Sequence, residues 1–311
     1  MKKILKLSYL IFSVFCHDVS EAGWSIISES GVEFPTAFSF TDENNGVIAG
    51  FFGMKYSSDG GMNWIKINPG VQTVTKIKFT GIDTGYLIGK QPGPLSGLYK
   101  STDKGATWFR IHQNYYIYDY HFINSSIGYM CEANGNVNMT TNGGLNWSFL
   151  INNSYTPTGI CFADQDNGIL IDADGRGLMT SNGGLNWQSV FLATGFSAKI
   201  FYPGAGAVYV LNYIPEAEVS IIRKSVNHGL TWKSVFFGFK GISSMFFVNA
   251  SIGYVAGSSG FISKTTNGGL NWTSQSLTSP ENFTDISFIN ENTGWITNID
   301  GVIYKTTNGG N

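Results

Sequence analysis

Short runs of alternating apolar and polar residues, separated by turns rich in Gly, Asn and Ser, make up most of the chain. Four segments show the pattern clearly: "KIKFTGIDTGYLIG", "YHFINSSIGYMC", "SMFFVNASIGYVAG" and "DISFINENTGWIT". Each joins a run ending in Phe, through a polar turn, to a second run that begins at Gly and an aromatic residue. Alternation with a period of two between turn residues is typical of β-strands, and long helical patterns are absent from the sequence. The chain is therefore predicted to be all-β.

A second motif recurs at nearly even intervals. Its fullest form, "TTNGGLNW", ends at Trp147 and again at Trp272, and related strings recur every 39 to 45 residues. These strings, which we call the boxes, end at Trp64, Trp108, Trp147, Trp187, Trp232 and Trp272. A further copy begins at Thr306 and breaks off with the end of the sequence. Self-similarity with this period is the signature of a repeat architecture.

The two motifs together define seven units of four short strands each. Strand A carries the Phe, strand B follows the Gly, strand C precedes the box and strand D follows its Trp. Such units predict propeller blades, because one small sheet buries its faces only against neighbouring sheets. A β-solenoid is the alternative, but its coils are usually shorter than about forty residues. We predict a single seven-bladed β-propeller of four-stranded blades over residues 23–311.

The two ends of the chain complement each other. The last unit has no Trp-bearing strand D, whereas "GWSII" at residues 23–27 resembles "NWSFL", the strand that follows a box Trp. Trp24 lies 40 residues before Trp64, which is one repeat. We therefore expect the N-terminal strand to pair with the last blade and close the ring, since this protects an otherwise exposed sheet edge.

The motifs resemble those of a known family. The string S/T-x-D/N-x-G-x-T/N-W is similar to the Asp-box, or bacterial neuraminidase repeat. With the F-[ND]-x-x-x-x-G-[YW] motif, the chain resembles the seven-bladed propellers of the photosystem II stability/assembly factor-like family over residues 23–311. The resemblance implies the fold and the theme of holding another protein. It implies no single activity, because such repeats also occur in sialidases, sorting receptors and glucanases.

The boxes are expected to stabilise turns rather than to act on a substrate. Asn and Asp side chains accept hydrogen bonds from nearby backbone N–H groups, and Gly adopts left-handed dihedrals at little cost. Burial of roughly 200 Å² of each indole between sheets, at about 25 cal/mol per Å², contributes about 5 kcal/mol at most. Asn is a poor acid or base, and a catalytic site does not need seven copies. The predicted structural tryptophans are the six above and Trp24.

Composition favours a folded domain and excludes two classes of partner. Only 13% of residues are charged and 42% are apolar, whereas disordered chains are charge-rich and poor in apolar residues. A formal net charge of -2 and a pI near 6.1 give no electrostatic reason to expect nucleic acid or an anionic membrane surface. We expect a monomer without a cofactor.

Histidines and cysteines do not form a ligand pattern. His112, His121 and His228 lie in unrelated contexts and lack zinc-ligand spacing, so no metal site is predicted. Cys131 and Cys161 allow one disulfide at most. Their apolar neighbours favour two buried thiols, although the sequence leaves their oxidation state open.

Residues 1–22 are predicted to be an export signal. Two lysines and an apolar stretch from Ile4 to Cys16 are followed by small residues before a cleavage point at Gly23. The stretch is too short and too interrupted for a membrane-spanning helix; an unprocessed buried strand is the alternative. We expect a secreted, periplasmic or cell-surface protein of a bacterial envelope, without membrane insertion after cleavage.

Arginine content argues against two functions of box-containing proteins. Sialidases bind a carboxylate through three converging arginines, and this chain has only Arg110, Arg176 and Arg223. Arg110 follows a box Trp and Arg223 precedes a box, so both are expected in outer hairpins, far from the axis. The same scattered arginines do not supply the arginine-rich patch that the photosystem-factor resemblance implies for a membrane-protein client.

Binding residues are expected on one face of the ring. The D–A and B–C connections share this side, which we call the loop face, whereas the A–B turns and the boxes share the other. Its irregular segments are expected at residues 90–97, 111–120 and 212–220, and loops on a rigid scaffold commonly carry binding function. Aromatic rings there suit contact with a protein or a sugar, or they pack on their own blade. The candidate residues are Tyr115, Tyr116, Tyr118, Tyr213, Asp174 and Arg176.

Two carboxylates form an alternative catalytic site. Where other blades carry Gly at the end of strand B, two adjacent blades carry Glu132 and Asp172. Paired carboxylates near the axis suit acid–base cleavage of a glycoside. However, "DADG" is also a turn sequence, and "NIDG" recurs in the last blade.

We interpret the chain as an exported, non-catalytic binding or scaffolding propeller, whose partner is another protein or a surface glycan. The alternative is a carbohydrate-binding protein or a glycoside hydrolase that uses Glu132 and Asp172. A longer protein with a C-terminal sorting domain beyond the seventh box is a third reading.

Overall fold

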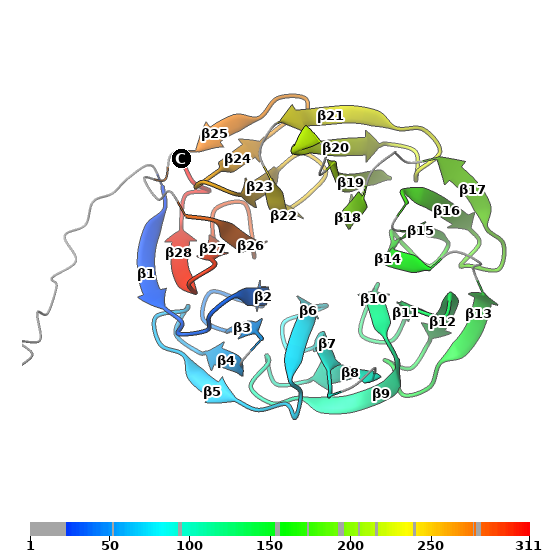
Figure 1. The fold of residues 1–311 in the computed structure, drawn as a ribbon, viewed down its shortest axis with the longest axis horizontal. Helices are drawn as coiled ribbons and strands as arrows, with labels where there is room; N and C mark the ends of the chain where they lie inside the picture. Colours follow the sequence, from blue (N-terminus) through cyan, green and yellow to red (C-terminus); the bar gives the residue numbers. More distant parts are fainter. Residues whose placement is uncertain are drawn as a thin grey trace, which may run out of the picture.

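The four strands expected for each repeat form one antiparallel sheet. The computed structural model describes residues 23–51, 53–92, 95–152, 156–172, 174–191, 196–204, 206–214, 217–238, 241–275, 277 and 281–311. Over these residues, seven four-stranded sheets stand around a common centre (Figure 1). The predicted seven-bladed propeller is thereby confirmed. The expected export signal at residues 1–22 lies outside the described part of the chain.

Each blade runs from an inner strand A to an outer strand D, as Figure 1 shows. Blades 1 and 2 contain β2 (Pro35–Phe40), β3 (Gly46–Gly50), β4 (Gly53–Ser57) and β5 (Ile65–Ile67), then β6 (Thr73–Phe79), β7 (Gly85–Lys90), β8 (Leu95–Ser101) and β9 (Phe109–Tyr115). Blades 3 and 4 contain β10 (Ile117–Phe122), β11 (Gly128–Glu132), β12 (Asn136–Thr140) and β13 (Ser148–Asn152), then β14 (Pro157–Phe162), β15 (Asn167–Asp172), β16 (Arg176–Ser181) and β17 (Gln188–Phe191). Blades 5 and 6 contain β18 (Phe196–Gly204), β19 (Ala207–Ile214), β20 (Val219–Ser225) and β21 (Lys233–Gly238), then β22 (Ile242–Phe247), β23 (Gly253–Gly257), β24 (Ile262–Thr265) and β25 (Thr273–Gln275). Blade 7 combines β26 (Phe283–Phe288), β27 (Gly294–Asn298) and β28 (Val302–Thr306) with β1 (Ser25–Glu29).

The first strand of the described chain closes the ring. Strand β1 pairs antiparallel with β28, with Ser25 opposite Lys305 and Glu29 opposite Val302. The preceding Trp24 is only 2% exposed. Its ring lies nearly perpendicular to that of Phe288, at a centroid distance of 5.8 Å. Closure by the N-terminal strand is therefore confirmed, and a buried indole holds it in place.

The boxes are turns closed by their own side chains. In the first box, the Ser57 hydroxyl accepts a hydrogen bond from the Gly61 N–H at 2.9 Å. Asp59 Oδ1 accepts one from the Asn63 N–H at 2.8 Å. The Gly61 backbone has a φ of +93°, which is costly for any residue with a Cβ. The hydroxyl-to-glycine bond recurs in the boxes that begin at Ser101, Thr140, Thr180, Ser225, Thr265 and Thr306.

Aromatic stacking joins neighbouring blades at five of the seven junctions. Phe122 at the end of β10 stacks on Tyr86 of the preceding blade, with ring centroids 3.6 Å apart. The box tryptophan of its own blade, Trp147, meets the same phenyl ring edge-on at 6.0 Å. Each such aromatic pair contributes about 0.5–1.5 kcal/mol beyond area burial. Equivalent stacks are Phe40–Trp295, Phe162–Tyr129, Phe247–Tyr209 and Phe288–Tyr254.

One expectation about the loop face was wrong. Residues 111–120, expected to be irregular, are almost entirely strand, because β9 runs to Tyr115 and β10 starts at Ile117. Only Tyr116 connects them. Residues 90–97 and 212–220 each span the end of a strand B and the start of a strand C, because β7 ends at Lys90 and β8 starts at Leu95, and β19 ends at Ile214 and β20 starts at Val219. Alternating aromatic and polar residues pair as extended strands here, and several of the polar side chains, such as Asp119 and Asn212, are buried. Among the described residues there is no helix long and apolar enough to cross a membrane.

Candidate functional site

The loop face exposes aromatic side chains from two blades. Phe34 and Phe51 of blade 1 are 48% and 52% exposed, and Tyr116 and Tyr118 of blade 3 are 40% and 45% exposed. Phe34 and Tyr116 directly precede the inner strands β2 and β10, and Phe51 follows β3. Exposed aromatic rings on rigid elements are typical of binding surfaces. Sequence analysis identified the two tyrosines but missed the two phenylalanines, which the "EFP" and "GFFG" strings contain.

Two of these aromatic residues have an unusual backbone conformation. Phe34 has a φ of +49° and Tyr116 a φ of +35°, values that cost a residue with a Cβ of the order of 1–3 kcal/mol. Tertiary hydrogen bonds hold both. The Phe34 N–H donates to the Ile299 carbonyl at 2.8 Å, and the Tyr116 carbonyl accepts from the Ala133 N–H at 2.9 Å. The two residues occupy the same position of their blades, so the fold presents these rings in a fixed direction.

The other predicted tyrosines contribute less to this surface. Tyr213 is half-buried near the end of β19, where it pairs with Ser220 of β20. The side chain of Tyr115 lies outside the described part of the structure. The exposed aromatic surface is therefore made by Phe34, Phe51, Tyr116 and Tyr118.

Asp172 closes a turn. It is 4% exposed, and its Oδ1 accepts hydrogen bonds from the backbone N–H groups of Asp174 at 2.9 Å and Arg176 at 2.8 Å. Asn298 makes the same two-bond closure in blade 7 with its neutral amide oxygen. A carboxylate is therefore not required for this geometry. The exposed Arg176 guanidinium lies 3.5 Å from Asp174 Oδ2, so these two predicted binding residues pair with each other.

Glu132 occupies the corresponding end of β11 and is 1% exposed. Its Oε1 lies 3.6 Å from His112 Nε2 of the outer strand β9, which belongs to the neighbouring blade. Glu132 and Asp172 thus end equivalent strands of adjacent blades, but different groups hold them. Their surroundings are those of buried structural carboxylates.

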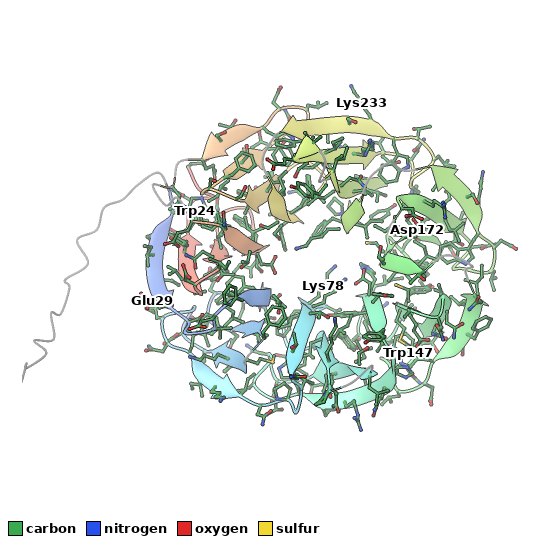
Figure 2. The ribbon with its side chains drawn as sticks, viewed as in Figure 1. Trp24, Glu29, Lys78, Trp147, Asp172 and Lys233 are labelled. Atoms are coloured by element: carbon green, nitrogen blue, oxygen red, sulfur yellow. The ribbon has the colours of Figure 1, made fainter. Side chains whose placement is uncertain are left out.

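The inner strands of all seven blades surround a central channel. It contains a cavity of about 310 Å³, lined by residues of β2, β6, β10, β14, β18, β22 and β26. Figure 2 shows Lys78 of β6 directed toward the centre of the ring. The channel also contains Lys76, Asp119, His121 and Cys161, none of which sequence analysis proposed as a site residue.

An ion pair joins three inner strands in this channel. The Lys76 ammonium of β6 contacts Asp119 Oδ1 of β10 and donates a hydrogen bond to the Tyr120 carbonyl at 3.0 Å. Asp119 Oδ2 accepts a hydrogen bond from the Ile160 N–H of β14 at 3.0 Å. This carboxylate therefore connects blades 2, 3 and 4 close to the axis.

A thiol and an imidazole lie side by side next to this ion pair. Cys161 Sγ is 3.6 Å from His121 Nδ1, and both residues are buried. Burial raises the pKa of the Cys161 thiol to about 11. Burial, together with the positive charges of Lys78 and Lys76, holds the pKa of His121 well below its usual range. At neutral pH the pair is a protonated thiol and a neutral imidazole, which is not an activated nucleophile. Among the described residues, His, Cys, Asp and Glu side chains form no cluster of three that could hold a metal ion.

Comparison with known proteins agrees with the architecture. Residues 224–311 match the model of the family described as photosynthesis system II assembly factor YCF48. YCF48 from Cyanidioschyzon merolae superposes with a TM-score of 0.70 at 19% identity, covering 92% of this chain and 98% of that one. YCF48 bound to D1 peptide superposes with a TM-score of 0.69 at 16% identity, covering 92% and 97%. The GH74 enzyme of Niastella koreensis gives a TM-score of 0.69 at 14% identity, covering 91% of this chain and 53% of the enzyme. No curated protein sequence matches the chain.

At these identities the structural likeness shows the fold alone. The family match, the boxes and the closure of the ring by β1 support the same assignment of the architecture. The chain is an Asp-box seven-bladed propeller that resembles the photosystem II stability/assembly factor-like family.

Proposed function

We propose that this propeller is a non-catalytic protein-binding module that holds a segment of a partner protein on its loop face. The observation that carries the proposal is the exposed aromatic surface, in which Phe34 and Tyr116 are held in left-handed conformations at equivalent positions of blades 1 and 3. Aromatic anchors that are already ordered lose little conformational entropy on binding. The family match over residues 224–311 and the fold shared with YCF48 bound to D1 peptide support a protein partner.

The absence of catalysis is part of the proposal. Asp172 performs a turn-closing role that Asn298 performs elsewhere, and Glu132 is buried beside His112. Both carboxylates are at most 4% exposed, and Oδ1 of Asp172 already accepts two backbone hydrogen bonds. The GH74 likeness extends over 53% of that enzyme.

Export to the bacterial envelope belongs to the same proposal and rests on residues 1–22. Fractionation of the producing cells, followed by N-terminal sequencing of the protein, tests it. A mature N-terminus at Gly23 in the envelope or medium is expected. An intact Met1 in the cell interior would contradict export without affecting the binding proposal.

Affinity capture from the envelope fraction tests the binding face. The double variant Phe34→Ala/Tyr116→Ala removes two anchors from the loop face, and Phe109→Ala/Phe149→Ala removes two exposed rings from the outer strands β9 and β13. We expect one protein to be retained by wild type and by the outer-strand control but lost by the loop-face variant. Equal retention by all three would refute the assignment of the face. Binding to a glycan array that depends on the same two residues would instead assign the face to a sugar.

A further inference from the structure

One ring of side chains in the central channel contains a single charge. The ring consists of one residue from each inner strand, the next-to-last residue before the A–B connection or the equivalent residue of the longer β18. Each pairs with a residue near the start of strand B, as Lys78 pairs with Tyr86. The structure describes this position in the other six blades as well. There the residue is serine in two blades and His121, Cys161, Phe201 or Phe246 in the remaining four. His121 is neutral at physiological pH because burial lowers its pKa. Lys78 is therefore the charged member of an otherwise neutral ring.

Among the residues that the structure describes, the Lys78 ammonium forms no direct ion pair, and the anion that acts on it, Asp119, is already paired with Lys76. It stands 5.6 Å from the centroid of the Phe201 ring. The other two lysines of the channel are compensated, since Lys76 contacts Asp119 and Lys199 lies 3.9 Å from Asp285 Oδ1. Burial lowers the pKa of Lys78, as expected for a cation that has lost part of its hydration. A partly desolvated charge without a direct ion pair is costly, and an opposite charge brought beside it lowers that cost.

We infer that the channel around Lys78 is a binding site for a small organic monocarboxylate with an apolar or aromatic body. The carboxylate would accept a charge-assisted hydrogen bond from Nζ, which is stronger than a neutral one. The body would pack on Phe201 and Phe246, whose ring centroids lie 5.5 Å apart. The cavity of about 310 Å³ is at the lower end of the range for small-molecule pockets, which favours a compact ligand.

The charges of the channel select a monoanion. Its three lysines face the carboxylates of Asp119 and Asp285, which leaves a surplus of one positive charge. A dianion such as inorganic phosphate would bring one negative charge too many into a site that already contains two carboxylates.

Of the four residues of the proposed protein-binding surface, only Tyr118 also lines the cavity. Lys78 is the penultimate residue of β6, next to the A–B connection, whereas the exposed aromatic residues lie at the opposite end of the inner strands. The inference therefore does not rest on the proposed function. Loss of protein capture and loss of carboxylate binding are expected to follow from different substitutions.

Calorimetric titration of the full chain with benzoate tests the site. Benzoate combines one carboxylate with an aromatic body, and benzamide is its neutral isostere. Lys78→Met removes the ammonium but keeps a long side chain, and Lys233→Met removes an exposed lysine from the rim strand β21, far from the channel in Figure 2. We expect saturable benzoate binding by wild type and by Lys233→Met, with Lys78→Met and benzamide each weaker by about tenfold or more. Inorganic phosphate is expected not to compete.

A second measurement needs no variant. Benzoate should slow acetylation of Lys78 by acetic anhydride in the wild-type protein, with Lys233 modified at an unchanged rate in the same sample. The inference is overturned by benzoate affinity that is equal in wild type and Lys78→Met, by benzamide binding as tightly as benzoate, or by competition from phosphate. It is equally overturned if millimolar benzoate neither binds nor protects Lys78.

Discussion

Truncation of the tryptophan that closes the ring, Trp24→Ala, is expected to destabilise the protein more than truncation of a box tryptophan. Trp24 is 2% exposed and packs among buried residues of blades 6 and 7, including Tyr254 and Phe288. Its indole N–H donates a hydrogen bond to Gln275 Oε1 at 2.9 Å. Box tryptophans such as Trp147 are only partly buried, although they make the same edge-on contact with a phenyl ring.

The magnitude follows from the buried surface. An indole of roughly 200 Å² at about 25 cal/mol per Å² contributes about 5 kcal/mol when its burial is complete. Measured Trp→Ala substitutions in protein cores cost about 3–5 kcal/mol, with a spread that reflects how far the cavity collapses. We therefore expect a loss of about 4–5 kcal/mol for Trp24→Ala and of about 3 kcal/mol for Trp147→Ala, whose ring retains solvent contact in the native state.

Guanidinium denaturation followed by far-ultraviolet circular dichroism measures both values. Phe149→Ala, at a residue that is 60% exposed on β13, serves as a surface control and should change the free energy of unfolding by less than about 0.5 kcal/mol. A Trp24→Ala variant within 1 kcal/mol of wild type would refute the view that this residue holds the ring closed. A smaller dependence of the unfolding free energy on denaturant in that variant would show that β1 detaches before the other blades unfold.

Three further predictions concern the boxes and the channel. Gly144→Ala should destabilise the protein by at least about 1 kcal/mol, because Gly144 has a φ of +89° and an added Cβ would meet the Ile111 side chain. Gly53→Ala is the control: an added Cβ there has open space, so this variant should be neutral or slightly stabilising in the same denaturation assay. Because the pKa of His121 is depressed in the folded state, the unfolded state takes up the proton first as pH falls below about 6.5. The free energy of unfolding should therefore fall by up to about 1.4 kcal/mol per pH unit between pH 6.5 and 5. His121→Gln should show a shallower slope. With its thiol pKa near 11 and its side chain buried, Cys161 should react with iodoacetamide at pH 8 at least about two orders of magnitude more slowly in the folded than in the denatured protein, as followed by mass spectrometry; equal rates would contradict its burial.

The architecture was predictable because its determinants are repeated. The hydroxyl, the acidic or amide residue, the glycine and the tryptophan of each box recur at one spacing, so departures in a single blade do not obscure the pattern. Even the closure of the ring followed from counting, since Trp24 supplies the strand that the last unit lacks. The turn chemistry depends on residues close together in sequence, and the indole that each box supplies is recognisable from the same short string although it packs on residues farther away.

The channel was not predictable in the same way. Lys78, His121 and Cys161 come from three blades about forty residues apart, and each looks like an ordinary polar or apolar residue of an alternating strand. Their proximity arises only when the seven inner strands meet. The error at residues 111–120 has a related cause. Polar and aromatic residues there were interpreted as a loop, but they belong to β9 and β10, where the polar Asp119 is buried by its contacts with Lys76 and the Ile160 N–H of neighbouring blades.

Comparison among blades separates residues that hold the fold from residues available for binding. The last residue of the inner strand is Phe in six blades, and in five of them it stacks on an aromatic ring of the preceding blade, as Phe122 does on Tyr86. The residue before it varies from serine to lysine, histidine, cysteine and phenylalanine without altering its pairing with strand B. A position that accepts such different side chains cannot depend on one of them for packing. Lys78→Met should therefore leave the free energy of unfolding unchanged or raise it, because it removes a charge without a direct ion pair, and any loss of ligand binding in this variant would report on the site itself.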